Sequence, residues 1–309
     1  MAIDSLWSNV VLLLQMEGEN NSTIITDAKG HAVTVSGNAK ISTAQSPLSI
    51  GSSLYLDGQD SPSTYIYLAD SVDWHFPGAY SVEFWLYIVS LKSGNGSWLF
   101  QQSNGVGGFC PLRLDLTSSG LLSVYGSTDN SSWFFSALNT SALSTDAWHY
   151  VEMSDDGTTF RVFVDGAVAA SRASWSKTDI AQPLMIGGGY SGGDRESNVY
   201  MSGLRITKGV ARHTSAYTTP TSKSPRPMIS GVVLDGSAAP VAKVVKAFKR
   251  STMLLAGEAV SNGSTGIYTL YPSDFTEHVV ARFDTATTPL VDGESGEVAL
   301  IYDRVIPGG

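Results

Sequence analysis

The sequence predicts an all-β protein built from antiparallel sheets that pack as sandwiches. Two runs of alternating apolar and polar residues, 148–153 and 160–164, flank the turn sequence Asp-Asp-Gly-Thr, which is the pattern of a β-hairpin. Turn dipeptides recur along the whole chain. No stretch of helical period exceeds about two turns, so the sequence contains no convincing amphipathic helix.

The hairpin pattern also assigns side chains to faces, because successive residues of a strand point to opposite sides. In the first run, Val151 and Met153 share one face and Tyr150 lies on the other. The second run ends in Asp165-Gly166, so we expect a further strand to fold back directly after it.

Asp-Gly and Asn-Gly pairs, which favour hairpin turns, divide the chain into short segments. Asp-Gly begins at residues 57, 156, 165, 235 and 292, and Asn-Gly at residues 95, 104 and 262. Between them we expect strands at 54–56, 65–68, 80–89, 97–101, 112–116, 121–125, 183–186 and 200–207.

A proline-rich segment separates two parts of the chain. Residues 218–227 hold three prolines among polar residues, and such a segment cannot enter a central strand. The strand pattern restarts at Ile229. We therefore predict a first domain over 1–217, a linker over 218–228 and a small β-sandwich over 229–309.

Composition excludes several classes of protein. With 42% hydrophobic and 15% charged residues, the chain does not have the profile of a disordered protein. A net charge of −9 without a long basic run argues against a nucleic-acid partner. The apolar run at 10–14 is too short to span a membrane, and no basic region precedes it, so we expect cytoplasmic synthesis and no membrane insertion. Cys110 is the single cysteine, which excludes an intrachain disulfide, and we expect it to be buried.

Several segments of the first domain carry a family resemblance. They are Ser53–Gly58, Tyr80–Leu86, the hairpin of residues 148–166 and Ser202–Thr207. Together they resemble the concanavalin A-like jelly roll of the laminin-G-like superfamily. Within it, the chain is most similar to a version common in virion proteins of tailed bacteriophages, with an opening strand at Trp7–Leu14 and a closing motif, Leu-Arg-Ile-Thr-Lys-Gly-Val-Ala-Arg, at Leu204–Arg212.

The second domain resembles a different sandwich. Gly231–Asp235, Pro240-Val241 and Thr265–Tyr268 match the pattern of prealbumin-like, or carboxypeptidase-regulatory-like, modules, which have no active site of their own. The fold class that the two resemblances imply is a concanavalin A-like jelly-roll sandwich followed by a small Ig/prealbumin-like β-sandwich.

We expect no catalytic residue and no cofactor. Hydrolases with the jelly roll carry Glu-x-Asp-x-x-Glu, which this sequence lacks, and we expect Glu83 to pair with an arginine or a backbone group. The five histidines have no metal-ligand spacing, so no metal ligand is assigned. Calcium is the cofactor left open, because four aspartates cluster around two turns: Asp57, Asp60, Asp70 and Asp73.

A glycan site needs an aromatic platform with convergent polar groups. We expect Trp85 and Trp148 to fill the core between the sheets, and this leaves other aromatic residues as candidates. The candidate glycan-binding residues are Trp133, Tyr190, Asp194 and Asn198.

The resemblance implies a non-enzymatic structural protein of a phage particle, made in the bacterial cytoplasm and present as an oligomer or in many copies. The first hypothesis is a decoration or accessory component of the capsid or tail that contacts other virion proteins. The alternative is a tail-associated attachment protein that binds a host surface glycan. A glycan-degrading enzyme is disfavoured because the carboxylate motif is absent.

Overall fold

The structure is a computed structural model, and it describes residues 4–48, 51–102, 109–189, 195–234, 237–272, 274, 276, 278–283, 299–305 and 307, without the side chains of 282–283 and 299–305. The fold is all-β, as the sequence predicts, and the helical parts of the described residues are the 3-10 turns η1 (Trp7–Asn9) and η2 (Val72–Trp74). No helix among the described residues has the length and apolar character needed to cross a bilayer. The chain divides into two compact units, residues 9–224 and residues 1–8 with 225–309.

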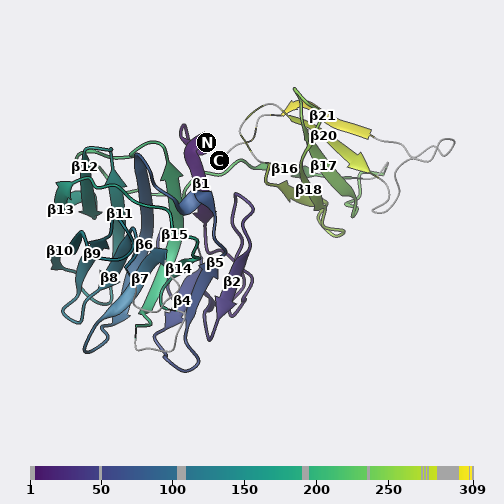
Figure 1. Cartoon of the computed structure of the whole chain (residues 1–309). Helices are drawn as coiled ribbons and strands as arrows, with labels where there is room; N and C mark the ends of the chain where they lie inside the picture. The colour runs from purple at the N-terminus through teal and green to yellow at the C-terminus, as the bar shows by residue number, and fades with distance from the viewer. Residues whose placement is uncertain are drawn as a thin grey trace. The chain divides into compact units, whose positions relative to one another are not determined.

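The unit of residues 9–224 is a sandwich of two antiparallel sheets, visible as two layers in Figure 1. In sheet A the strand order is β13-β12-β11-β6-β15-β4-β3, and β1 also pairs with β15. The strands of sheet A are β1 (Val10–Leu14), β3 (Lys40–Ser42), β4 (Ser53–Asp57), β6 (Tyr80–Ser90), β11 (Trp148–Asp155), β12 (Thr159–Val164), β13 (Ala167–Ala173) and β15 (Asn198–Lys208).

Sheet B has the strand order β10-β9-β8-β7-β14-β5-β2. Its strands are β2 (Val33–Ser36), β5 (Tyr65–Leu68), β7 (Ser97–Gln102), β8 (Arg113–Leu116), β9 (Leu121–Gly126), β10 (Phe135–Ala142) and β14 (Leu184–Ile186). Neighbours in both sheets are often far apart in sequence, as in a jelly roll, so most pairing is non-local.

The core of this unit lies between the two sheets and follows from strand alternation. In β6, Val82, Phe84 and Leu86 are fully buried members of the core, while Glu83 and Trp85 point to the opposite, outer face of sheet A. Because the long central strands repeat this pattern, the outer face of sheet A carries a second ordered set of side chains.

A tight turn and a crossing segment cover part of that outer face. Asp165 and Gly166 join β12 to β13, and both have positive φ, 51° and 79°, which is the geometry of a type I′ hairpin turn. The segment of residues 209–217, here called the covering segment, follows β15. The Tyr217 amide donates to the Gly166 carbonyl oxygen (2.9 Å), and Ser154 Oγ donates to the His213 carbonyl oxygen (2.8 Å).

The second unit contains a four-stranded sheet, β18-β17-β20-β21, and a two-stranded sheet, β16-β19. Its strands are β16 (Ile229–Val232), β17 (Val244–Lys249), β18 (Leu255–Val260), β19 (Ile267–Leu270), β20 (His278–Phe283) and β21 (Ala299–Val305). A separate small core, which includes Ile229, Val245, Tyr268, Leu270 and Val280, holds this unit together.

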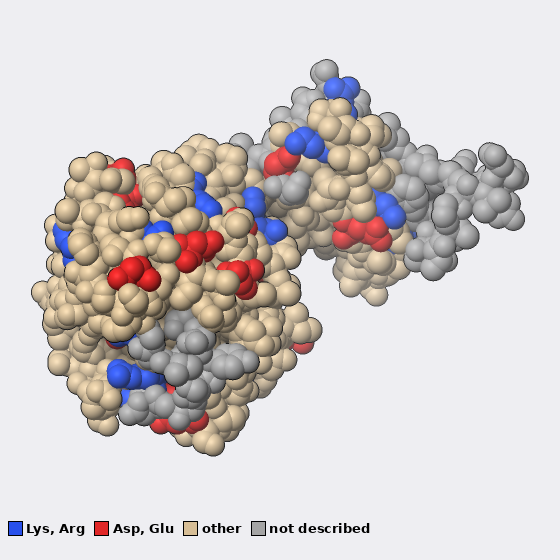
Figure 2. Space-filling model, in the orientation of Figure 1, with Lys and Arg blue, Asp and Glu red and all other residues tan. Residues whose placement is uncertain are grey.

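Charge is sparse on the surface of the protein. On the face seen in Figure 2, Asp and Glu form several separate patches, and most of the surface carries no charged side chain. This agrees with a chain of low charged content and a net charge of −9.

Candidate functional site

A row of aromatic side chains crosses the outer face of sheet A. Tyr200 in β15 is the cross-strand partner of Tyr55 in β4 on one side and of Tyr87 in β6 on the other. Tyr87 is in turn the partner of Trp148 in β11. Directly opposed residues of an antiparallel sheet point to the same face. Tyr55, Tyr200, Tyr87 and Trp148 therefore form one line across four adjacent strands, which we call the aromatic row.

The rings of the aromatic row touch in sequence. The ring centroids of Tyr55 and Tyr200 are 4.6 Å apart and stacked, those of Tyr200 and Tyr87 are 5.8 Å apart and edge-on, and those of Tyr87 and Trp148 are 5.5 Å apart. All four side chains are partly exposed. The row is thus an ordered, accessible aromatic surface, the kind that packs against the apolar faces of a sugar.

The positions of Trp85 and Trp148 correct the expectation that they fill the core. Trp85 packs on Tyr150 at 5.0 Å, on the outer face of sheet A, and Trp148 belongs to the aromatic row. Both are partly exposed. The alternation that buries Val151 and Met153 sends Trp148 and Tyr150 to the outer face, so the signal for Trp148 was present in the hairpin itself.

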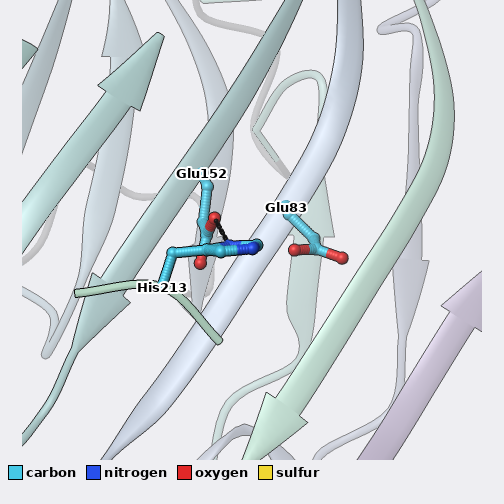
Figure 3. Close-up of side chains that lie close together, drawn as sticks. All are labelled: Glu83, Glu152 and His213. Atoms are coloured by element: carbon cyan, nitrogen blue, oxygen red, sulfur yellow. Dashed lines mark hydrogen bonds and ion pairs between the residues drawn. The ribbon is translucent and has the colours of Figure 1, made fainter. Parts of the chain in front are cut away.

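A buried carboxylate pair lies on the same outer face, under the covering segment. Glu83 in β6 is the direct cross-strand partner of Glu152 in β11, and both are fully buried. Figure 3 shows the two carboxylates on adjacent strands with the His213 ring beside them. One ligand atom from each of the three residues lies within 4.8 Å of the others. No sequence motif marks this pair, because its members belong to strands that are far apart in the chain.

Each carboxylate has its own partners. Glu83 Oε1 pairs with Arg205, as expected for an arginine partner, and Arg212 Nε lies 4.0 Å from the same oxygen. Glu152 accepts from Ser81 Oγ (2.9 Å), and His213 Nδ1 lies 2.7 Å from Glu152 Oε2.

The covering segment closes this cluster from above. The His213 ring stacks on Tyr217 with centroids 3.5 Å apart, and Tyr217 meets Phe163 of β12 edge-on at 5.4 Å. Burial raises the pKa of the Tyr217 hydroxyl, and the nearby Glu152 adds to this effect. Retaining glycosidases place two carboxyl groups about 5–5.5 Å apart, and both face a substrate cleft. Here both carboxylates are sealed, so the cluster anchors the covering segment.

A model of a known protein family matches the jelly-roll part of the chain. The model of the concanavalin A-like lectin/glucanases superfamily matches residues 57–214, just over half of the chain. The chain belongs to this superfamily.

Two solved structures share the fold at low sequence identity. The binding domain of Paraclostridial Mosquitocidal Protein 1 is 13% identical with a TM-score of 0.53, covering 96% of this chain and 76% of that chain. The binding domain of botulinum neurotoxin serotype D is 11% identical with a TM-score of 0.50, covering 98% of this chain and 80% of that chain. At these identities the likeness concerns the fold alone. No curated protein matches the sequence.

The cluster of Glu83, Glu152 and His213 is poorly suited to bind a metal ion. Among the described residues, Glu83, Glu152 and His213 form the one group with metal-ligand proximity. The guanidinium groups of Arg205 and Arg212 already lie beside Glu83. A divalent cation would be repelled by both arginines and would have to displace an existing ion pair.

The four aspartates considered for calcium lie in different surroundings. Asp57 accepts from Asn38 Nδ2 (2.8 Å), Asp60 pairs with Lys92, Asp73 Oδ2 lies 3.0 Å from His31 Nε2, and Asp70 is exposed. Within the described parts of the chain, no three of them come together as ligands. Calcium binding at these turns stays a prediction.

Two of the four predicted glycan-binding residues, Trp133 and Asn198, lie in the described part of the chain, and they lie at different sheets. Trp133 follows β9 and lies beside sheet B, where its ring contacts Tyr125 at 5.4 Å and the Arg113 guanidinium at 4.8 Å. Asn198 lies at the start of β15 in sheet A, where its Nδ2 donates to Ser90 Oγ (2.8 Å). Tyr190 and Asp194 lie outside the described residues. A glycan-binding role for these four residues stays a prediction.

The contacts of Arg113 explain the position of Trp133. Its guanidinium makes a bidentate ion pair with Asp115, at 2.9 and 3.2 Å, and lies 4.4 Å from the centre of the Tyr125 ring. Burial raises the pKa of Asp115 to about 6, although the Arg113 charge opposes this shift. Trp133 therefore covers a buried ion pair, whereas the aromatic row of sheet A places four rings in register on adjacent strands.

Proposed function

We propose that the chain is a non-enzymatic carbohydrate-binding protein and that the aromatic row of sheet A is its binding surface. One observation carries this proposal: four partly exposed aromatic side chains lie in register on four adjacent strands. Ordering aromatic residues on central strands gives a preformed surface with little conformational freedom to lose when a ligand binds. A sugar chain laid across the strands would meet an aromatic ring at each one.

The carboxylate pair is the reason why we propose a function without catalysis. A glycosidase needs one carboxyl group that protonates the leaving oxygen and a second that faces the sugar. Glu83 and Glu152 are fully buried and held by Arg205 and His213. In a superfamily that includes lectins and glucanases, these sealed carboxylates favour the lectin function. The two toxin fragments of similar fold are named as binding domains, which is in line with this choice.

The test compares glycan binding by the wild-type chain with binding by Tyr87→Ala and Trp148→Ala. On an array of bacterial surface polysaccharides, we expect binding by the wild type and a loss of about tenfold or more in each variant, because each removes a large stacking surface. Tyr67→Ala is the matched control, since Tyr67 is a partly exposed tyrosine in β5 of sheet B. Equal binding by all variants, or release of reducing sugar by the wild type, would contradict the proposal.

We also propose that the chain is a multi-copy accessory component of a tailed phage particle. The support comes from the phage-type opening and closing motifs, which pair as neighbouring strands: Val10 with Thr207 and Leu14 with Leu204. Exposed apolar side chains of the second unit offer a surface for a protein partner. Val232 and Ile267, which face each other across β16 and β19, are about half exposed, at 50% and 53%.

Particles purified by density gradient test this second proposal. We expect the protein to remain bound after gentle washing, and Val232→Ser with Ile267→Ser to reduce its amount on the particle while the chain still folds. If the wild-type protein washes off or is absent from the particles, the virion role is wrong, and the glycan-binding proposal is unaffected.

A further inference from the structure

A depression adjoins the aromatic row at its Tyr55 end. Its volume is about 380 Å³, which falls in the range of small-ligand sites, about 300–1,000 Å³. Residues from three chain segments line it: Asn21 and Thr23, residues 37–40, and Tyr55 with Asp57. Lys40 in β3 is the cross-strand partner of Tyr55, so the depression begins where the aromatic row ends.

The depression combines a carboxylate, an amide and an ammonium group with one aromatic ring. Asn38 Nδ2 donates to Asp57 Oδ2 (2.8 Å), and the Gln59 amide donates to Asp57 Oδ1 (3.1 Å). Burial alone would raise the pKa of Asp57, but hydrogen bonds from Asn38, Thr64 and Gln59 outweigh it and lower the pKa. Asp57 is therefore an ionised hydrogen-bond acceptor at neutral pH.

Lys40 is a donor available to a ligand. Within the described residues, no carboxylate pairs with the Lys40 ammonium group, whose side chain lines the depression. An ammonium group offers three N–H donors, and the Asn38 amide adds a further donor beside Asp57. The depression thus offers a ligand both hydrogen-bond donors and hydrogen-bond acceptors.

The wall that carries Asn38 is fixed in place. Gly37 has φ +62°, and an added Cβ would overlap the Ser63 carbonyl oxygen, so the β2–β3 turn lies directly on the segment before β5. The Asn38 backbone N–H donates to Thr64 Oγ1 (3.2 Å), and Ser36 Oγ donates to the Ser63 carbonyl oxygen (3.1 Å). A site on a fixed wall loses little entropy when it binds a ligand.

We propose that this depression binds a neutral hexose unit with adjacent free hydroxyl groups, as the end subsite of the glycan held by the aromatic row. The inference rests on the proposed carbohydrate-binding function and adds the class of sugar. One hydroxyl donates to the Asp57 carboxylate, its neighbour accepts from Lys40 or Asn38, and the apolar face of the ring packs on Tyr55. A uronic or sialic acid fits less well, because its carboxylate has no hydrogen to donate to Asp57 and is repelled by it, and pairing that carboxylate with Lys40 instead removes Lys40 from the hydroxyl contact.

The experiment titrates the full chain with methyl glycosides of neutral hexoses and with the matching uronic acids, using ligand-observed NMR. We expect the wild type to bind at least one neutral hexose and to bind its uronic acid more weakly. Asp57→Asn keeps the size of the side chain but removes the charged acceptor, so affinity should fall by about tenfold or more. Lys40→Met should lower it several-fold. Asp70→Asn, an exposed aspartate outside the depression, is the matched control and should bind as the wild type does.

The outcomes separate this inference from the proposed function. If Asp57→Asn and Lys40→Met bind like the wild type while Tyr87→Ala loses binding, the end subsite is wrong and the aromatic row stands. A preference for the uronic acid also overturns the inference. If no glycan binds the wild type, the proposed function fails and this inference fails with it. Thermal unfolding of each variant verifies that lost binding is not lost folding.

Discussion

Glu83 is a charged residue in a fully buried position, and its neighbours explain how the fold tolerates it. Arg205 pairs with it from β15, and Arg212 approaches from the covering segment. Removing two charges from water is costly, and the mutual attraction offsets that cost only when both partners are present. The pair therefore adds little to the net free energy of unfolding. Its main effect is to favour one packing arrangement, in which β15 and the covering segment lie against β6.

Breaking this pair should destabilise the jelly roll strongly. In Arg205→Met, the Glu83 carboxylate stays buried without its main partner, and we expect the free energy of unfolding to fall by about 3–5 kcal/mol. Urea unfolding measures the change. Adding Glu83→Gln to Arg205→Met should recover part of the loss, because the buried charge is then gone. A loss below about 1 kcal/mol in the single variant would show that the pair is solvated.

The reactivity of the Cys110 thiol tests whether this residue is buried in the native protein. Burial raises the pKa of its thiol to about 12, and only the thiolate reacts with disulfide reagents. Because the raised pKa keeps the thiol protonated at neutral and mildly alkaline pH, we expect the native protein to be unreactive with an aromatic disulfide at pH 8. Unfolding in urea should restore the rate of an ordinary cysteine. A native protein that reacts at the unfolded rate would place Cys110 at the surface.

At the scale of elements, the covering segment is held by a turn rather than by strand pairing. The Tyr217 amide bonds to the Gly166 carbonyl oxygen at the β12–β13 turn, and a Cβ on Gly166 would overlap the Tyr217 carbonyl oxygen. The glycine thus serves both the positive φ of the turn and the close approach of the segment that seals Glu152.

Gly166→Ala tests this arrangement. We expect a stability loss of about 1–3 kcal/mol from backbone strain and displacement of the covering segment, together with faster hydrogen exchange of the Tyr217 amide. Gly157→Ala is the matched control, because Gly157 has a similar φ of +87° with open space around its missing Cβ. If both variants lose the same stability and the Tyr217 amide remains protected, strain alone is responsible and the contact is unimportant.

The sequence predicted the single elements and, through the family resemblance, the jelly-roll fold, but it did not predict which side chains become neighbours across the sheets. The hairpin of β11 and β12, with Val151 and Met153 inward, followed from alternation and from turn residues, which are local signals. The aromatic row escaped notice because Tyr55, Tyr87, Trp148 and Tyr200 become neighbours only through the order β4-β15-β6-β11. Cross-strand register between distant segments is a tertiary property, so neither this row nor the Glu83–Glu152 pair has a sequence motif.

At the scale of the whole molecule, the chain combines two units with separate cores. The predicted linker at 218–228 contains prolines and polar residues, and a protease should reach it more easily than either core. Brief proteolysis of the full chain should therefore yield two resistant fragments that meet within this segment, measured by mass spectrometry. One resistant fragment that spans residues 218–228 would contradict the predicted domain organisation.

Contact between a glycan and the aromatic row of sheet A can be measured at single tyrosine side chains. The most direct test is ¹⁹F NMR of the chain labelled with 3-fluorotyrosine, with signals assigned by single Tyr→Phe variants and titrated with the best glycan from the array. We expect the signals of Tyr87 and Tyr200 to shift with increasing glycan while the signal of Tyr67 in sheet B stays in place. A glycan that shifts the Tyr67 signal and leaves Tyr87 and Tyr200 unchanged would place the binding surface elsewhere.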